Sequence, residues 1–496
     1  MLNGFGPAVE IAGTKDAIEA DHGVADMTSP DAMAVGRRID RIGSARAARR
    51  DSQPGGREWS RNMQKRTSSR NIKSMAKELP GQVVLVLQGG GALGSYQAGV
   101  YQSLHEAGIE PDWIIGTSIG AINASLIAGN RREDRLPKLK QFWKRMEQNP
   151  VWNIRTAFPG FNEQLSYWAT ITHGIAGFFR PHALAHAGDS YPLGAEHAGY
   201  YSTAPLEQTL AELVDVDLLN SCVPRLTVGA AHVRTSQMRY FDSRDGELTI
   251  RHIMASGALP PAFPAVRIEG ELYWDGGILS NTPTEVVFDD TPRKNSLIFA
   301  VHLWNPAGLE PTTVAEVLSR HKDVQYSSRI ISHIARQQQA HRLRHIINEL
   351  AKRLSDSERN TPEVRELVGY GCQTRMHVVR LLAPRLDNED HTKDVDFSPS
   401  GIRRRWEAGY ANTCRAIEQA PWQGEFDPLD GVILHEPNNV GQVEQVVKTS
   451  MAPTRRVLEP AGPPVNSRNT SVPERATRRP FGAPSDHSRG FTSPLR

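Results

Sequence analysis

Ordered structure is expected to begin abruptly near residue 78, where an apolar run follows a long polar segment. Residues 82–87 read QVVLVL, an almost wholly apolar and β-rich run. Such runs are typical of strands that are buried on both faces of a parallel sheet. A glycine-rich turn follows, and it leads into a helical pattern that extends through 101–107 and ends at Gly108. The pattern therefore predicts a strand, a turn and a helix.

The same order repeats directly afterwards. Residues 111–115 predict a second strand, which passes through Gly116-Thr117-Ser118-Ile119-Gly120 into a helical pattern over 121–128. Two strand–helix pairs in such a short stretch predict βαβ units with right-handed crossovers, and hence an α/β fold. Residues 132–200 give no clear pattern. Further expected elements are strands over 226–231, 272–274 and 297–303 and helices over 206–214 and 250–256.

The pattern becomes helical from residue 313 to about residue 354, with apolar positions that include Val314, Val317 and Leu318. Residues 374–382 (TRMHVVRLL) predict a strand. Ser398-Pro399 fits a helix N-cap followed by proline at the first helical position, so a helix is expected to about residue 417. This C-terminal part either covers the α/β domain or completes it.

The two ends of the chain differ in composition from its centre. Residues 1–77 are rich in Arg, Ser, Ala, Gly and Asp and show no periodicity. Such a segment cannot bury enough apolar surface to offset the entropy of ordering, so disorder is predicted. The Pro- and Arg-rich tail is predicted to be disordered as well. The expected organisation is a disordered segment over 1–77, an α/β domain over 78–310, a mostly helical extension over 311–452 and a disordered tail over 453–496.

Positive charge is concentrated at the ends. Residues 37–77 hold 13 Lys and Arg against 3 Asp and Glu, and residues 453–496 hold 8 against 3, although the whole chain has a net charge of only +3. The central part is therefore acidic, and net charge gives no reason to expect a nucleic-acid partner. Attraction of 37–77 to anionic lipid is one alternative, which would allow peripheral association with a membrane. A solvated tail is the other.

Cysteine usage and hydropathy favour a soluble, cytoplasmic protein. Cys222, Cys372 and Cys414 are widely spaced and odd in number, and they suggest neither a disulfide framework nor a zinc site. No run of 18 apolar residues and no secretory signal are recognisable, so no membrane-spanning helix is predicted. No loop is rich enough in Asp and Glu to suggest calcium. We expect no metal and no cofactor.

The first chemical motif is the G-x-S-x-G pentapeptide at the second strand-to-helix junction. A serine at such a junction sits in a strained backbone, and Gly116 and Gly120 allow the strand and the helix to pass closely. The following helix directs its first N–H groups and the positive end of its dipole towards Ser118, where negative charge develops during acyl transfer. Ser118 is the candidate nucleophile. The alternative is a glycine-rich turn without chemistry.

The second motif, over residues 89–94, matches G-x-G-x-x-G between a strand and a helix. A dinucleotide site would need an acidic residue at the end of the second strand, which instead ends at Ser118. No lysine follows Gly94, so a phosphate loop is not indicated. Consecutive glycines can instead present unobstructed N–H groups beside a serine nucleophile. We therefore favour an oxyanion hole formed by the main chain of Gly89, Gly90, Gly91, Ala92 and Gly94.

The third motif is Asp275-Gly276-Gly277, which directly follows the strand expected over 272–274. A serine nucleophile needs a base within hydrogen-bond reach, and an aspartate at a strand end, followed by two glycines that open the turn, can supply one. An ordinary Asp-Gly turn is the simpler interpretation. A histidine base is the rival interpretation, and His302 is its best candidate because it closes a predicted strand.

Together these motifs resemble the patatin-like phospholipase family. The resemblance runs from Gln82 to about Pro283 and includes residues 255–260 (ASGALP), Phe263-Pro264 and Asn281-Thr282-Pro283. It implies a three-layer α/β/α fold with a mainly parallel sheet. It also implies hydrolysis of lipid acyl esters by a Ser–Asp dyad, with Ser118 as nucleophile and Asp275 as proton acceptor. Residues 313–423 resemble a C-terminal extension found in a bacterial subset of the family.

The resemblance has one departure. Many members carry arginine where this chain has Leu93, so a preference for charged phospholipids is not implied. The expected activity is that of a phospholipase A or lysophospholipase, which releases fatty acid. The alternatives are an esterase of small esters or hydroxy-acid oligoesters and a catalytically silent lipid-binding protein. The sequence does not indicate acyl length, head group or oligomeric state.

Overall fold

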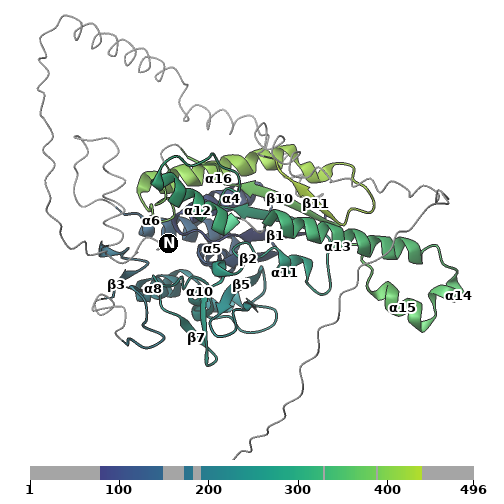
Figure 1. The fold of residues 1–496 in the computed structure, drawn as a ribbon, viewed down its shortest axis with the longest axis horizontal. Helices are drawn as coiled ribbons and strands as arrows, with labels where there is room; N and C mark the ends of the chain where they lie inside the picture. The colour runs from purple at the N-terminus through teal and green to yellow at the C-terminus, as the bar shows by residue number, and fades with distance from the viewer. Residues whose placement is uncertain (1–78, 149–171, 183–191, 328–329, 387–388, 438–496) are drawn as a thin grey trace, which may run out of the picture. The chain divides into compact units, whose positions relative to one another are not determined.

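The computed structural model describes most of the chain between the two polar ends (Figure 1). The segments 1–77 and 453–496, which are predicted to be disordered, lie outside the described residues. No helix in the described part is long and apolar enough to cross a bilayer. The described ranges are 79–148, 172–182, 192–327, 330–386 and 389–437.

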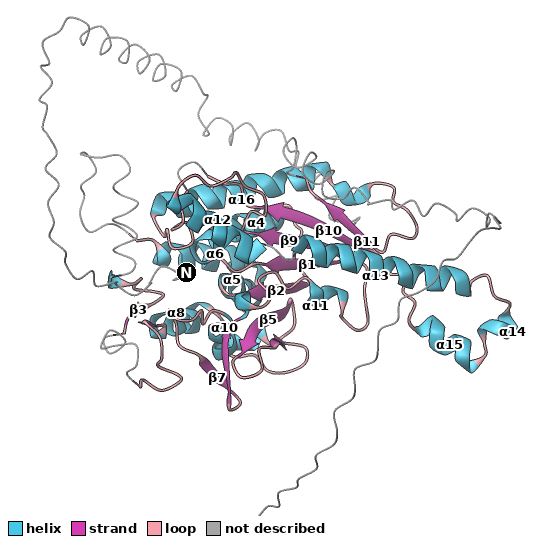
Figure 2. Cartoon of the chain, viewed as in Figure 1, coloured by secondary structure: helices cyan, strands magenta, loops and turns pink. Residues whose placement is uncertain are grey.

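A nine-stranded sheet forms the centre of the described chain (Figure 2). Its strand order is β11-β10-β9-β1-β2-β5-β8-β7, and β6 also pairs with β5. Every pairing from β11 to β5 is parallel, whereas β6, β7 and β8 pair antiparallel. The predicted mainly parallel sheet is confirmed. The strands are β1 Gln82–Leu87, β2 Trp113–Thr117, β5 Arg225–His232, β6 Met238–Asp242, β7 Val266–Ile268, β8 Glu271–Asp275, β9 Ser296–His302, β10 Met376–Leu382 and β11 Val432–His435, and β3 Arg180–Pro181 pairs separately with β4 Tyr201–Ser202.

Helices cover both faces of the sheet. Alternate residues of β1 belong to two different apolar cores, because successive side chains of a strand point to opposite faces. Leu85 packs in the core that contains residues of α4, α5, α6 and α16, while Val84 packs with Phe288 of α11 and Ile334 of α13. The fold therefore has three layers, α/β/α. These helices are α4 Ser95–Glu106, α5 Ile119–Ala128, α6 Arg132–Met146, α11 Glu285–Phe288, α13 Ile330–Ala351 and α16 Pro399–Gln419.

Shorter elements connect these layers. The Ser398 side chain accepts a hydrogen bond from the Gly401 N–H at 3.1 Å, as expected for the N-cap of α16. The Glu316 carboxylate accepts from the Thr313 N–H at 3.1 Å at the start of α12. The remaining elements are η1 Gly91–Gly94, α8 Ala204–Leu213, α9 Val216–Leu219, α10 Ile250–Ser256, η3 Gly276–Ile278, α12 Val314–Ser327, α14 Asp356–Arg359, α15 Pro362–Gly369 and η4 Pro421–Gln423.

The C-terminal extension completes the sheet. Strand β10 lies parallel to β9 over its whole length, and β11 follows it at the edge. Helix α16 packs closely on α4: a Cβ at Gly99 would lie 2.0 Å from the Trp406 carbonyl oxygen, and one at Gly409 would lie 2.1 Å from that of Tyr96. Glycine at both positions lets the two backbones touch. The extension is mostly helical, as predicted, but its two strands belong to the same sheet as β1.

Candidate active site

Two strands that run towards each other share one edge of β5. Strand β2 pairs with the first part of β5, up to Thr117 opposite Gly229. The antiparallel β8 pairs with the next part, from Asp275 opposite Ala230. Strand β6 lies along the same residues of β5 and so occupies its other edge. The carboxyl ends of β2 and β8 therefore meet, and this brings Ser118 to Asp275.

Ser118 forms a tight turn between β2 and α5. Its backbone has φ 57° and ψ −127°, in the left-handed half of φ space that non-glycine residues rarely adopt. The Ser118 N–H lies 3.1 Å from both the carbonyl oxygen and the Oγ of Ser256. The Ser256 hydroxyl in turn donates to the Gly229 carbonyl at 2.6 Å. Ser256, which the sequence did not assign to the site, thus fixes the turn.

The glycines on either side of Ser118 allow a close approach of the backbone. A Cβ at Gly116 would lie 2.4 Å from the Gly120 carbonyl oxygen, and one at Gly120 would lie 2.2 Å from that of Leu87. Neither position has room for a side chain. Helix α5 begins at Ile119, so its first N–H groups, which have no partner within the helix, lie beside Ser118. The positive end of the helix dipole favours negative charge at this point.

Asp275 is almost completely buried, with 2% of its surface exposed. Its Oδ1 accepts a hydrogen bond from the Gly277 N–H at 2.7 Å. Burial raises the pKa of Asp275 from 3.8 to about 6, against the lowering effect of hydrogen bonds from the Ser118 hydroxyl and the Gly277 N–H. A carboxylate with a pKa in this range accepts protons at neutral pH more readily than an exposed one. The arrangement suits a general base beside a hydroxyl.

The five residues expected in the oxyanion hole have different surroundings. The Gly89 N–H donates to the Asn281 carbonyl at 3.2 Å, and the Ala92 N–H donates to the Asp394 carbonyl at 2.8 Å. Gly94, at the end of the loop, packs against α5, where a Cβ would lie 2.5 Å from the Ile119 side chain. Among the described residues, the N–H groups of Gly90 and Gly91 have no acceptor. Of the five residues expected to form the oxyanion hole, Gly90 and Gly91 therefore remain as the candidate donors.

Side chains that the sequence did not assign hold the glycine loop in place. The Trp304 indole N–H donates to the Gly89 carbonyl at 2.9 Å, and the Asn281 amide donates to the same oxygen at 3.2 Å. The side-chain amide oxygen of Gln88, Oε1, accepts from the Leu303 N–H at 2.5 Å. Asn281 lies in the Asn-Thr-Pro run noted above. Gln88 and Trp304 belong to no such motif, so the sequence around them gives no indication that they lie at the site.

A pocket opens beside Ser118; together with its opening to solvent it holds about 320 Å³ of space free of protein atoms. Two of its lining residues come from the C-terminal extension: Tyr326 at the end of α12 and Asp394 from the segment before α16. Asp394 is paired with Lys322 at 2.8 Å. The lining residues are Gly89, Gly90, Gly91, Ser118, Leu259, Asp275, Gly277, Asn281, Trp304, Tyr326 and Asp394.

No histidine lines this pocket among the described residues. His302, the rival candidate for the base, is buried at the end of β9, and its pKa is lowered well below the usual value by burial and by Arg380. The geometry therefore favours Asp275 over His302. Within the described ranges, no group of three His, Cys, Asp or Glu side chains is placed to hold a metal ion.

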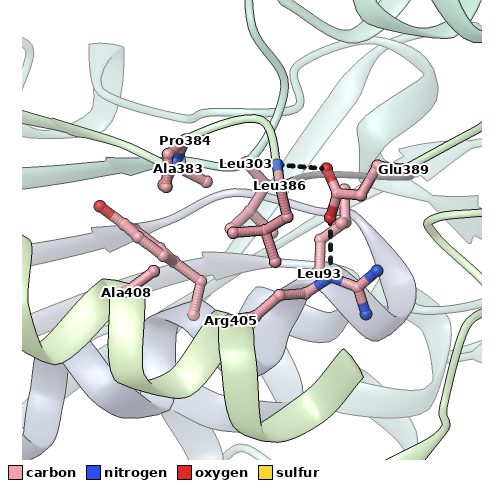
Figure 3. A pocket seen from close by; sticks show the side chains of 9 residues that line it. Leu93, Leu303, Ala383, Pro384, Leu386, Glu389, Arg405 and Ala408 are labelled. Carbon is pink, nitrogen blue, oxygen red and sulfur yellow. Dashed lines mark hydrogen bonds and ion pairs between the residues drawn. The ribbon is translucent and has the colours of Figure 1, made fainter. Parts of the chain in front are cut away.

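Leu93 lines a second, smaller pocket (Figure 3), and Ser118 is not among the residues that line it. The side chain of Arg405, from α16, lines the same pocket. This guanidinium is buried and paired with Glu389 at 3.2 Å and with Asp396 at 3.1 Å. A cation therefore lies near the loop although residue 93 is a leucine, but its charge is neutralised by its two carboxylate partners.

Gly276→Ala is expected to reduce activity and stability together. A Cβ at Gly276 would lie 2.4 Å from the Gly229 carbonyl oxygen, so the backbone next to Asp275 must move. We expect a loss of about 2 kcal/mol in the free energy of unfolding and at least a tenfold loss of turnover. Urea denaturation and an ester assay measure the two effects. The control is Gly246→Ala, because a Cβ at Gly246 meets nothing within 4 Å. Equal behaviour of the two variants would contradict the prediction.

Two models of known families match parts of this chain. The family model described as "Patatin-like phospholipase" matches residues 85–288, and a second model described as "Patatin phospholipase" matches residues 324–429. The first match contains Ser118 and Asp275, and the second contains Tyr326 and Asp394. Ser118 and Asp275, the two candidate catalytic side chains, therefore lie in a segment that is similar to patatin-like phospholipases.

Curated relatives are similar over part of their length. The lysophospholipase nte1 of Aspergillus terreus is 28% identical over 273 residues, which are 50% of this chain and 15% of that protein. The patatin-like phospholipase domain-containing protein 6 of Mus musculus is 39% identical over 224 residues, 44% of this chain and 13% of that protein. The match thus spans about one seventh of these relatives. The crystal structure of VipD from Legionella pneumophila is 16% identical with a TM-score of 0.30, covering 68% of this chain and 67% of VipD.

Proposed function

We propose that this chain hydrolyses acyl esters of lipids and releases fatty acid through a dyad of Ser118 and Asp275. The observation that carries the proposal is the meeting of these two side chains beside the amides of Gly90 and Gly91. A strained serine, a buried carboxylate with a raised pKa and unpaired N–H donors are the three components that acyl transfer needs. They come from three separate segments of the chain.

The reaction would proceed in two displacements. Asp275 accepts the proton of the Ser118 hydroxyl as Oγ attacks the ester carbonyl carbon, and the Gly90 and Gly91 amides bind the resulting oxyanion. The C–O bond to the alcohol then breaks, and Asp275 returns the proton to the departing oxygen. In the second half, Asp275 accepts a proton from water as the water attacks the acyl-serine. Collapse of this intermediate releases the fatty acid and restores the Ser118 hydroxyl.

Each component contributes in its own way. One oxyanion donor is worth about 3 kcal/mol in comparable enzymes, so the two amides supply a substantial part of the catalysis. The raised pKa of Asp275 brings the base closer to the pKa of the groups with which it exchanges protons. The backbone of Ser118, with its positive φ, keeps the hydroxyl at the turn, within reach of Asp275 and of the two amides.

The substrate class is inferred from the relatives and from the pocket. Curated relatives are named a lysophospholipase and a triacylglycerol lipase. The pocket wall includes Leu259, Trp304 and Tyr326, which suit an acyl chain. No Lys, Arg or His is among the described lining residues, and Lys322, the partner of the lining residue Asp394, is already paired with it. The wall therefore offers no unpaired cation for an anionic head group. A neutral acylglycerol or a zwitterionic lysophospholipid, whose phosphate is balanced by its own cation, fits these features best.

Covalent labelling tests the proposal most directly. A fluorophosphonate probe is expected to modify the full chain once, on the peptide that contains Ser118, and to leave the Ser118→Ala variant unmodified. The control is Ser357→Ala, which replaces an exposed serine in α14 and should label like the wild type. Mass spectrometry of a mixed lipid extract, treated with wild type or with Ser118→Ala, then identifies the acyl esters consumed. Labelling that persists in Ser118→Ala, or no labelling of the wild type, would refute the dyad.

A further inference from the structure

Helix α12 has polar residues on its inner face and apolar residues on its outer face. Ser319, Asp323 and Ser327, spaced four residues apart, are its buried positions. A helix on the surface of a protein in water normally has the opposite arrangement. We call the exposed apolar side chains of this helix and the preceding loop the α12 outer face. They are Leu309 (84% exposed), Val314 (78%), Val317 (50%), Leu318 (37%) and Val324 (47%).

Polar contacts hold the inner face of α12 in place. Asp323 pairs with Lys393 at 2.7 Å, and the neighbouring Lys322 pairs with Asp394 at 2.8 Å. All four side chains are largely buried. Turning the helix over to hide its apolar residues would break both ion pairs and leave buried charges without partners, which is costly. The α12 outer face is therefore fixed towards the outside.

The same helix forms part of the candidate active site. Tyr326, in its last turn, lines the pocket beside Ser118. The Tyr326 carbonyl accepts hydrogen bonds from the side-chain amides of Gln88 at 3.2 Å and Asn281 at 3.4 Å. Gln88 directly precedes the glycine loop, and Asn281 also donates to the Gly89 carbonyl. Through these contacts α12 is joined to the loop that contains the proposed oxyanion donors. Whatever binds the α12 outer face is thus held next to the pocket.

We propose that the α12 outer face inserts into the surface of a phospholipid bilayer and holds the pocket against it. The choice of a lipid surface rests on the proposed function, because lipid esters are presented to an enzyme at such surfaces. Exposed apolar side chains on one helix face bind at the boundary between head groups and acyl chains, with a strength that follows the apolar area buried. Val314, Val317, Leu318 and Val324 supply that area on α12 itself.

Vesicle flotation tests the proposal. The protein is the full chain with Ser118→Ala, so that the vesicles are not consumed, and the vesicles are pure phosphatidylcholine. Combined Val314→Ser, Val317→Ser, Leu318→Ser and Val324→Ser changes are expected to lower the partition coefficient at least ~10-fold, because four apolar groups lose their burial. The matched control replaces four exposed leucines of α13, α15 and the segment after α13 by serine: Leu343, Leu350, Leu354 and Leu367. It is expected to float like its parent.

Three results would overturn the proposal. The first is a parent protein that does not float, and the second is an equal loss in the control variant. The third is a parent that is dimeric by sedimentation velocity and becomes monomeric with the α12 changes, because the face would then bind a second copy. A Trp placed at Val317 gives a second readout: its fluorescence should shift to shorter wavelength when vesicles are added. Since Ser118 is absent throughout, failure here leaves the dyad untouched, and failure of the labelling test leaves the flotation result valid.

Discussion

Ser118→Ala is expected to abolish ester hydrolysis, with a loss of about 10⁴-fold or more in turnover. Without the hydroxyl no acyl-enzyme can form, and the remaining amides and pocket can only position a substrate for attack by water. Turnover of p-nitrophenyl acyl esters measures the effect. The fold should be unaffected, because the Ser118 contacts to Ser256 are made by its backbone N–H, which alanine keeps.

The Ser118→Ala result needs a control for folding, because the turn at residue 118 has an unusual backbone. Circular dichroism and the urea midpoint of Ser118→Ala should match those of the wild type within error. Ser357→Ala, in the exposed part of α14, should keep full activity. Full turnover by a folded Ser118→Ala variant would exclude the proposed nucleophile.

Asp275→Asn is expected to remove activity and, at the same time, to stabilise the fold. The amide cannot accept the proton from Ser118, so a loss of about 10³–10⁴-fold in turnover is expected. It can still accept the hydrogen bond from the Gly277 N–H. The variant no longer buries a negative charge, and this removes a cost that the wild type bears at neutral pH.

The pKa of Asp275 gives the sign and the size of this stabilisation. Its folded value of about 6 lies above the unfolded value of 3.8, so folding favours the protonated carboxyl. The contribution of Asp275 to the free energy of unfolding is therefore greatest below pH 4, and this contribution is lost as the pH rises through about 6. A shift of this size corresponds to about 3 kcal/mol, an upper bound for the gain by Asp275→Asn at pH 8. At pH 4 the two proteins should differ little.

Two measurements check the Asp275 prediction. Urea denaturation of wild type and Asp275→Asn at pH 4 and pH 8 gives the difference in stability, and an assay across pH gives the titration of the base. Wild-type kcat/KM should fall as the pH drops through about 6, because Asp275 then becomes protonated. His302→Ala is the comparison variant for activity. An active Asp275→Asn together with an inactive His302→Ala would instead identify histidine as the base.

The elements predicted best are those whose pattern is imposed by burial. Strand β1 matches the predicted range 82–87, since a strand with helices on both faces must be apolar throughout. Helix α10, Ile250–Ser256, also matches its prediction. Strand β6 is half-exposed, and β11 has only four residues, so neither gives a clear signal in the sequence. Helix α6 contains Pro137 and many charged residues, which hide its helical periodicity.

The parts of the site that could be predicted are those in which the proposed chemistry requires an unusual backbone conformation or a close approach of two backbones. The motifs around Ser118, Asp275 and the glycine loop each require glycine at defined places, and the structure brings all three together. Their roles stay predictions until the variants are measured. Tyr326 and Asp394 could not be predicted, because they reach the pocket through ion pairs between α12 and residues about 70 positions further along.

Helix α12 shows the limit of reasoning from periodicity alone. The spacing of Val314, Val317 and Leu318 correctly predicts a helix. Periodicity also suggests that such residues face the core, but here they face outwards, because the polar residues between them have buried ionic partners. These partners lie in the segment before α16, so the sequence of α12 and its neighbours gives no means of predicting the ion pairs.

The pairing of β9 with β10 has a practical consequence for anyone who wishes to shorten this protein. A version limited to the first family match, residues 85–288, would begin inside β1 and end before β9. One that stops after residue 310 would leave β9, which is buried over its whole length, as a bare edge, open to pairing with other molecules. Recombinant versions that remain in solution as single molecules should therefore run from residue 79 to at least residue 437.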